Sequence, residues 1–85
     1  MIDVEKRIIA YDAGMHMDLE QLLLEQGSKQ TNLWGVNLYQ NVTDSNWVEF
    51  DSMINIKPKD NNRSRGVEDI KIRNTILEII KHLIL

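Results

Sequence analysis

Residues 47–57 read Trp-Val-Glu-Phe-Asp-Ser-Met-Ile-Asn-Ile-Lys, and apolar side chains recur there at nearly every second position. Such alternation places one set of side chains on each face of a β-strand. The pattern predicts a half-buried strand over residues 47–57, and Pro58 ends it because proline donates no backbone hydrogen bond. The buried face of this strand would hold Val48, Phe50, Ser52, Ile54 and Ile56.

Two further strands are predicted before this one, in residues 2–10 and residues 33–40, both of which are rich in strand-forming side chains. The polar residues 41–46 are few enough to join residues 33–40 to residues 47–57 as an antiparallel hairpin. The connection from the first strand is longer and has room for a helix.

The register of the hairpin follows from its apolar residues, because a slip of one residue would turn every side chain to the other face. Pairing Leu38 with Val48 gathers the apolar residues of both strands on one side. We expect the opposite face to be a polar surface in water, a self-association surface or the floor of a ligand site. That face would hold Tyr39, Trp47, Glu49 and Asp51.

A short helix is predicted over residues 19–26. Asp18 is a suitable N-cap, Gln21 stands three residues later as in a capping box, and Gly27 supplies the left-handed residue that ends the helix. Its buried stripe would consist of Leu19, Leu22 and Leu23. His16, just before it, could serve as a metal ligand or a general base, but a turn residue is the simpler interpretation.

A second helix is predicted over residues 70–83, with Asp69 as its N-cap and isoleucines at helical spacing. The order of elements is therefore βαββα. The economical architecture is a single small α+β domain over residues 1–85, with a three-stranded sheet and both helices packed on one face.

The composition excludes several classes of protein. The 85 residues include no cysteine, which excludes disulfide scaffolds, cysteine-based zinc sites and cysteine nucleophiles. No apolar run approaches the roughly 20 residues of a membrane span, and the N-terminus has no apolar segment of the kind found in signal peptides. We expect a cytoplasmic protein with no membrane partner. We also expect no cofactor and no metal, since two carboxylates alone are too few ligands for a hard cation.

Charge is unevenly distributed along the chain. Residues 1–56 carry three basic and nine acidic side chains, whereas residues 57–85 carry seven basic and four acidic ones. The net charge of −3 argues against nucleic acid as a partner. The two charged halves favour either self-association or the attraction of an anionic ligand to one end.

Residues 61–66 read Asn-Asn-Arg-Ser-Arg-Gly and lead into the second predicted helix, whose N-terminus favours anions. Asn62, Arg63 and Arg65 are therefore candidate ligands of a small anion or phosphate. The alternative is that the arginines pair with carboxylates of the same chain, such as Glu68 or Asp69.

Four stretches, residues 22–30, 33–39, 50–58 and 62–69, resemble in the same order a family of small prokaryotic proteins classed as a domain of unknown function. The resemblance implies no activity and no catalytic residues. It also implies that other members carry a helical segment before the first strand, and a proline where this chain has Ile70.

These observations favour a non-enzymatic, self-associating protein, most simply a homodimer formed through the face that carries Tyr39 and Trp47. The alternative is an anion-binding protein or small enzyme. In that version Arg63 and Arg65 would hold the anion, and Glu49 or Asp51 would supply acid–base groups.

Overall fold

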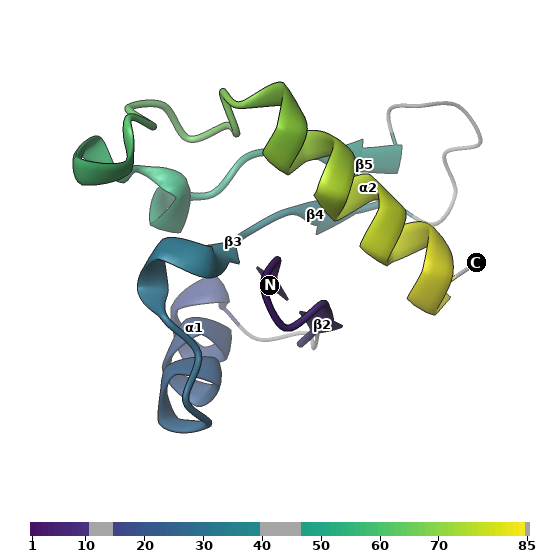
Figure 1. Ribbon diagram of the computed structural model, residues 1–85, viewed down its shortest axis with the longest axis horizontal. Helices are drawn as coiled ribbons and strands as arrows, with labels where there is room; N and C mark the ends of the chain where they lie inside the picture. Colours follow the sequence, from purple (N-terminus) through teal and green to yellow (C-terminus); the bar gives the residue numbers. More distant parts are fainter. Residues whose placement is uncertain (11–14, 40–46, 85) are drawn as a thin grey trace.

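The computed structural model describes residues 1–10, 15–39 and 47–84, and it confirms an α+β protein (Figure 1). Two α-helices and five two-residue strands lie within these ranges. They are β1 (Ile2–Asp3), β2 (Ile8–Ile9), α1 (His16–Glu25), β3 (Leu33–Trp34), β4 (Asn37–Leu38), β5 (Val48–Glu49) and α2 (Ile70–Ile84). The strands form an antiparallel three-stranded sheet in the order β2–β1–β3 and a separate β4–β5 hairpin.

The N-terminal segment is a hairpin, so the prediction of one strand over residues 2–10 was wrong. The buried Asp3 carboxylate accepts hydrogen bonds of 2.9 Å from the backbone N–H groups of Glu5 and Lys6. Arg7 then adopts a left-handed backbone conformation with φ of 56°. A carboxylate that binds nearby N–H groups stabilises a turn, and here it folds β2 back onto β1.

The two helices pack on opposite faces of the three-stranded sheet, rather than on one face as predicted. Leu33 packs with Leu19 and Leu23 of α1, whereas its neighbour Trp34 packs with three isoleucines of α2: Ile76, Ile79 and Ile80. Consecutive residues of a strand point to opposite faces. Figure 1 accordingly shows β3 between the two helices. Because β3 is buried on both sides, its sequence shows no polar face that would have revealed this.

The hairpin register was predicted correctly, because β4 and β5 pair Leu38 with Val48 and Asn37 with Glu49. The length of both strands was overestimated. Of the strand predicted over residues 33–40, Leu33–Trp34 belongs to one sheet and Asn37–Leu38 to the other, and the strand predicted over residues 47–57 ends at Glu49. A single-turn 3₁₀ helix over Met53–Asn55 replaces the rest of the alternating pattern.

Asn55 explains why the alternating stretch does not remain a strand. Its side chain is fully buried and accepts a 2.8 Å hydrogen bond from the Gly35 backbone N–H. Its amide group donates to the carbonyl oxygens of Gly35 at 3.0 Å and Arg65 at 2.9 Å. Buried polar groups require partners of this kind. Both partners come from other segments of the chain. Residues 53–55 therefore form a 3₁₀ turn, and not a strand, where Asn55 makes these contacts.

The boundaries of α1 also differ from the prediction. The helix begins at His16, and its N-cap, Met15, makes no side-chain capping bond, so Asp18 lies inside the first turn. Gly27 has the predicted left-handed conformation, with φ of 96°. Leu22 is 44% exposed, which leaves Leu19 and Leu23 as the buried pair.

The prediction for α2 is confirmed. Asp69 Oδ1 accepts a 2.8 Å hydrogen bond from the Lys71 backbone N–H, as an N-cap should. The buried isoleucines follow the predicted helical spacing, although Leu83 at the end of the stripe is exposed.

Lys57 is a basic residue that lies in a buried environment. It is only 6% exposed, and its Nζ donates to the carbonyl oxygens of Gln30, at 2.7 Å, and Leu33. The ammonium also lies 4.0 Å from the centre of the Trp34 ring, a cation–π contact. Burial lowers the pKa of Lys57 from 10.5 to about 8.

We expect the free energy of unfolding to rise with pH as Lys57 loses its proton. The pKa is about 8 in the folded protein and 10.5 when the side chain is in water, so the unfolded chain holds more protons between these values. Stability then increases with pH, by about 2 kcal/mol between roughly pH 7 and pH 9.5. Urea unfolding at the two pH values measures this. A Lys57→Met variant, which cannot titrate there, should show a clearly smaller rise, and an equal rise would contradict the assignment.

Candidate functional site

An open groove of about 660 Å³ lies between β5, residues 64–68 and the start of α2. Its apolar lining comes from Val48, Phe50 and Val67, of which the two valines are buried. Three exposed charged residues also line it: Glu49, Glu68 and Arg73. Sites for small molecules combine an apolar lining with a few polar groups in this way.

Arg73 is the cation of the groove, and the fold fixes its position. Its backbone N–H donates to the Asp69 carbonyl oxygen at 3.0 Å within the first turn of α2, and its guanidinium carbon lies 4.8 Å from the centre of the Phe50 ring. No carboxylate oxygen of the described residues lies within 4.0 Å of its nitrogens. The stacked guanidinium is therefore oriented but not neutralised by an ion pair there.

Glu49 is held by two neighbours on the exposed side of the hairpin. Its Oε1 accepts hydrogen bonds of 3.0 Å from Asn37 Nδ2 and from the Tyr39 hydroxyl. The hydrogen bond to Glu49 and the negative charge of that carboxylate raise the pKa of Tyr39 above 10.0. Both bonds use the same oxygen, so Oε2 remains able to accept from a ligand.

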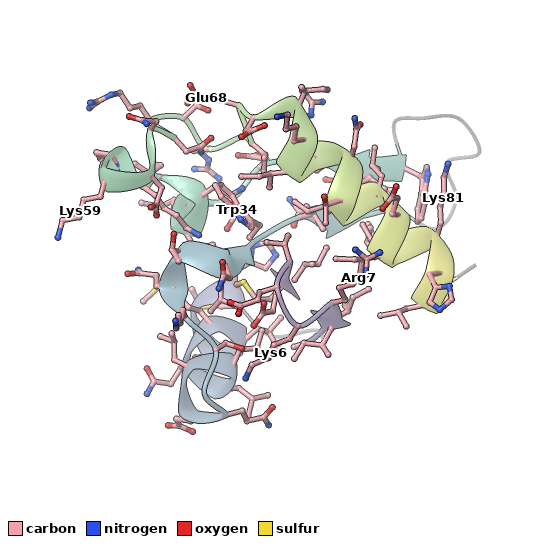
Figure 2. The ribbon with its side chains drawn as sticks, viewed as in Figure 1. Lys6, Arg7, Trp34, Lys59, Glu68 and Lys81 are labelled. Atoms are coloured by element: carbon pink, nitrogen blue, oxygen red, sulfur yellow. The ribbon has the colours of Figure 1, made fainter. Side chains whose placement is uncertain are left out.

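Glu68 closes the loop that forms the other wall of the groove. Its Oε2 accepts backbone hydrogen bonds from Arg63 at 2.8 Å and Ser64 at 2.9 Å, and these bonds lower the pKa of Glu68 below 4.5. Figure 2 shows Glu68 at the outer edge of the molecule, just before α2, whereas Trp34 lies near the centre. Glu68 thus stays negatively charged while it shapes the loop.

The candidate anion ligands in this loop take up different roles. Asn62 is buried, and its side chain donates to the carbonyl oxygens of Asn55 and Gly66 at 2.7 Å and accepts from the Glu68 N–H at 2.8 Å. Arg65 Nε lies 2.6 Å from Asp51 Oδ1, so this arginine pairs with a carboxylate of the same chain. The exposed Arg63 makes no ion pair with a described residue. An anion site built on all three residues stays a prediction.

The predicted hairpin face is only partly assembled as expected. Tyr39, Glu49 and Asp51 lie close together, since Asn37 Nδ2 bonds both Glu49 Oε1 and the Asp51 carbonyl oxygen. Trp47, however, packs partly buried against the main core. The ion pair between Arg65 and Asp51 also joins this face to the loop over residues 61–66.

Sequence reasoning missed Arg73, Phe50 and Val67 as site residues. Arg73 was counted only among the excess of basic residues, and Phe50 was assigned to the core. Their contact depends on α2 crossing β5, which no local pattern reveals.

A family model described as "Protein of unknown function (DUF5674)" matches residues 1–83. The chain belongs to the DUF5674 family. This confirms the resemblance to a family of unknown function. No curated protein and no solved structure matches the chain significantly.

This DUF5674 chain has a second polar cluster away from the groove, where α1 begins. His16 Nδ1 and Ser52 Oγ share a 2.7 Å hydrogen bond beside Gly35. Ser52 is buried, and burial is the main reason that the pKa of His16 lies below 6.5. A buried hydroxyl is poorly placed to attack a substrate, so we interpret the pair as a structural link between α1 and the 3₁₀ turn.

The described residues of this DUF5674 member include neither a metal-binding cluster nor a membrane-spanning helix. Within residues 1–10, 15–39 and 47–84 there is no group of three or more His, Asp or Glu side chains placed to hold a metal ion. The described helices include none that is both long and apolar enough to cross a membrane.

Proposed function

We propose that this protein binds a small organic carboxylate in the groove between β5 and α2. The observation that carries the proposal is Arg73, which is stacked on Phe50 and has no described carboxylate within 4.0 Å. A guanidinium offers paired N–H donors that match the two oxygens of a carboxylate. Because stacking already orders the side chain, binding costs less conformational entropy.

The apolar lining indicates what else the ligand carries. Of the three apolar lining residues Phe50 is partly exposed and both valines are buried, so Phe50 is the residue against which a short hydrocarbon chain attached to the carboxylate would pack. The volume of about 660 Å³ lies in the range of roughly 300–1,000 Å³ that is usual for small-molecule sites. This proposal keeps the anion-binding alternative drawn from the sequence but transfers the main role from Arg63 and Arg65 to Arg73.

A titration with 4-methylpentanoate, followed by ¹H–¹⁵N NMR spectra, tests the proposal. We expect shifts of the groove residues with a Kd in the millimolar range, about −4 kcal/mol. Arg73→Gln should weaken binding about tenfold or more, because a hydrogen bond to a charged group contributes roughly 1.5–3 kcal/mol.

The matched control is Lys71→Gln, which removes one positive charge from the same turn of α2 at an exposed residue outside the groove lining. It should bind 4-methylpentanoate as the unmodified protein does. Binding that is absent, or that is equally strong in the Arg73 and Lys71 variants, would contradict the proposal.

Self-association through the hairpin face is the second candidate function. The specific observation in its favour is Tyr39, which is 45% exposed beside Glu49 on the solvent side of the hairpin. Tyrosine is enriched in protein interfaces. Trp47 contributes less than the sequence predicted, because it packs against the core.

Absolute mass from light scattering tests the second candidate. A homodimer would have twice the chain mass of 9.9 kDa, and Tyr39→Asp should halve that mass without unfolding the chain. Met53→Asp, at another exposed apolar residue, is the control and should leave the mass unchanged. A monomeric unmodified protein would remove this candidate.

A further inference from the structure

We infer that the ligand of the groove is a free amino acid with an apolar side chain, bound as a zwitterion between Arg73 and Glu49. This inference rests on the proposed function and extends it, because it assigns a second charge to the ligand and a partner to that charge. Three features of the groove support it: its net charge, the separation of its charged groups and its apolar lining.

The charge of the groove disfavours a ligand that is only anionic. One guanidinium, from Arg73, faces two carboxylates, from Glu49 and Glu68. The negative charge of Glu68 is stabilised by the backbone N–H groups of Arg63 and Ser64. Glu49 has no cation within 4.0 Å among the described residues, so its charge remains to be compensated. A ligand that carries an ammonium group as well as a carboxylate would compensate it.

The two charged groups do not neutralise each other, so both can take part in binding a ligand. Arg73 and Glu49 line the same groove, yet they do not form an ion pair within 4.0 Å. Each is oriented by other contacts, Arg73 by the Phe50 ring and Glu49 by Asn37 and Tyr39. Groups that are fixed apart in this way bind a ligand with less reorganisation than groups that must first separate.

The remaining lining selects the side chain of the amino acid. Val48, Phe50 and Val67 are apolar, and Ser64 and Gly66 add no charge. A branched aliphatic side chain would pack against Phe50, the apolar lining residue that is partly exposed. A phosphate ester is a poorer fit, because it would bring about two negative charges close to Glu49 and Glu68 with a single guanidinium to offset them.

The experiment compares three probes that share one branched aliphatic group and differ in the charged groups attached to it. L-Leucine has both charges, 4-methylpentanoate lacks the ammonium, and L-leucinamide lacks the carboxylate. Binding is followed by ¹H–¹⁵N NMR. We expect leucine to bind about tenfold more tightly than either analogue, since each lacks one charge-assisted hydrogen bond.

Two variants assign each charge to its residue. Glu49→Gln keeps the oxygen that accepts from Asn37 and Tyr39, and it should weaken leucine and leucinamide about tenfold. Binding of 4-methylpentanoate should be unchanged or slightly tighter, because a negative charge is removed from the groove. Arg73→Gln should weaken leucine and 4-methylpentanoate, whereas binding of the cationic leucinamide should be unchanged or slightly tighter. Lys71→Gln serves again as the control for a general change in charge.

The outcomes separate this inference from the proposed function. If 4-methylpentanoate binds in an Arg73-dependent manner but leucine binds no more tightly, the amino-acid inference is overturned and the carboxylate site stands. If leucine binds more tightly but Glu49→Gln leaves its affinity unchanged, the role assigned to Glu49 is wrong. If none of the three probes shifts the groove resonances, both are overturned.

Discussion

Gly35→Ala is expected to lower the free energy of unfolding by about 3 kcal/mol or more, a large fraction of the roughly 5–15 kcal/mol that stabilises a typical small protein. A Cβ at this position would lie 2.7 Å from both Cβ and Oγ of Ser52 and 2.9 Å from His16 Nδ1. All three distances are too short for non-bonded atoms, so one of the neighbours would have to move.

Neither side of this contact is free to move. Ser52 is buried, and its backbone N–H donates to the Arg65 carbonyl oxygen at 2.9 Å. Asn55 binds both the N–H and the C=O of Gly35. Relief of the clash would therefore break buried hydrogen bonds, each of which is costly to lose.

Urea unfolding followed by circular dichroism measures the effect, with Gly66→Ala as the matched control. A Cβ at Gly66 would lie 3.4 Å from the Phe50 carbonyl oxygen and 3.6 Å from Ser64 Oγ. These contacts need little adjustment, so we expect a change of about 1 kcal/mol or less. Equal stability of the two alanine variants would show that the neighbourhood of Gly35 is looser than the structure indicates.

Asn55→Ala is expected to have an effect of similar size, about 3–5 kcal/mol. The substitution removes the Asn55 partner of the Gly35 N–H and of the Gly35 carbonyl. It also removes one of two donors to the Arg65 carbonyl, which keeps the Ser52 N–H. Gly35 is itself buried, so its two groups have no route to water. A buried donor or acceptor that loses its partner costs about 1–3 kcal/mol.

Asn74→Ala is the control for the loss of an asparagine. Asn74 is exposed on α2, where alanine has the higher helix propensity, so stability should stay the same or rise by a few tenths of a kcal/mol. The Asn55 assignment would be refuted if Asn55→Ala unfolded at the same urea concentration and with the same slope as the unmodified protein.

The features predicted correctly are those that neighbouring residues decide. The helical spacing of Ile76, Ile79 and Ile80 predicts α2, and Asp69 caps it through a bond to a residue two positions away. The register of β4 and β5 follows from apolar positions separated by a short loop. In these cases the deciding interactions lie close together in the sequence, so the pattern itself contains them.

Long-range contacts decided the features that were predicted wrongly. The stretch over residues 47–57 has the period of a strand, but Asn55 binds Gly35, which lies 20 residues away, and the chain turns to bring them together. The separation of the helices on two faces of the sheet depends on β3 being buried on both sides, a property its two apolar residues do not display.

The candidate site shows the same division between sequence and tertiary structure. The sequence by itself determined an α+β protein, its second helix, the pairing of Leu38 with Val48 and the position of Glu49 on the exposed side of the hairpin. Only the tertiary structure placed Arg73 over Phe50, paired Arg65 with Asp51 and formed the open groove that Arg73, Phe50 and Glu49 line. The physical reason is that periodicity reports which face of an element avoids water, whereas the distance between two charged side chains depends on how elements far apart in the sequence pack against each other.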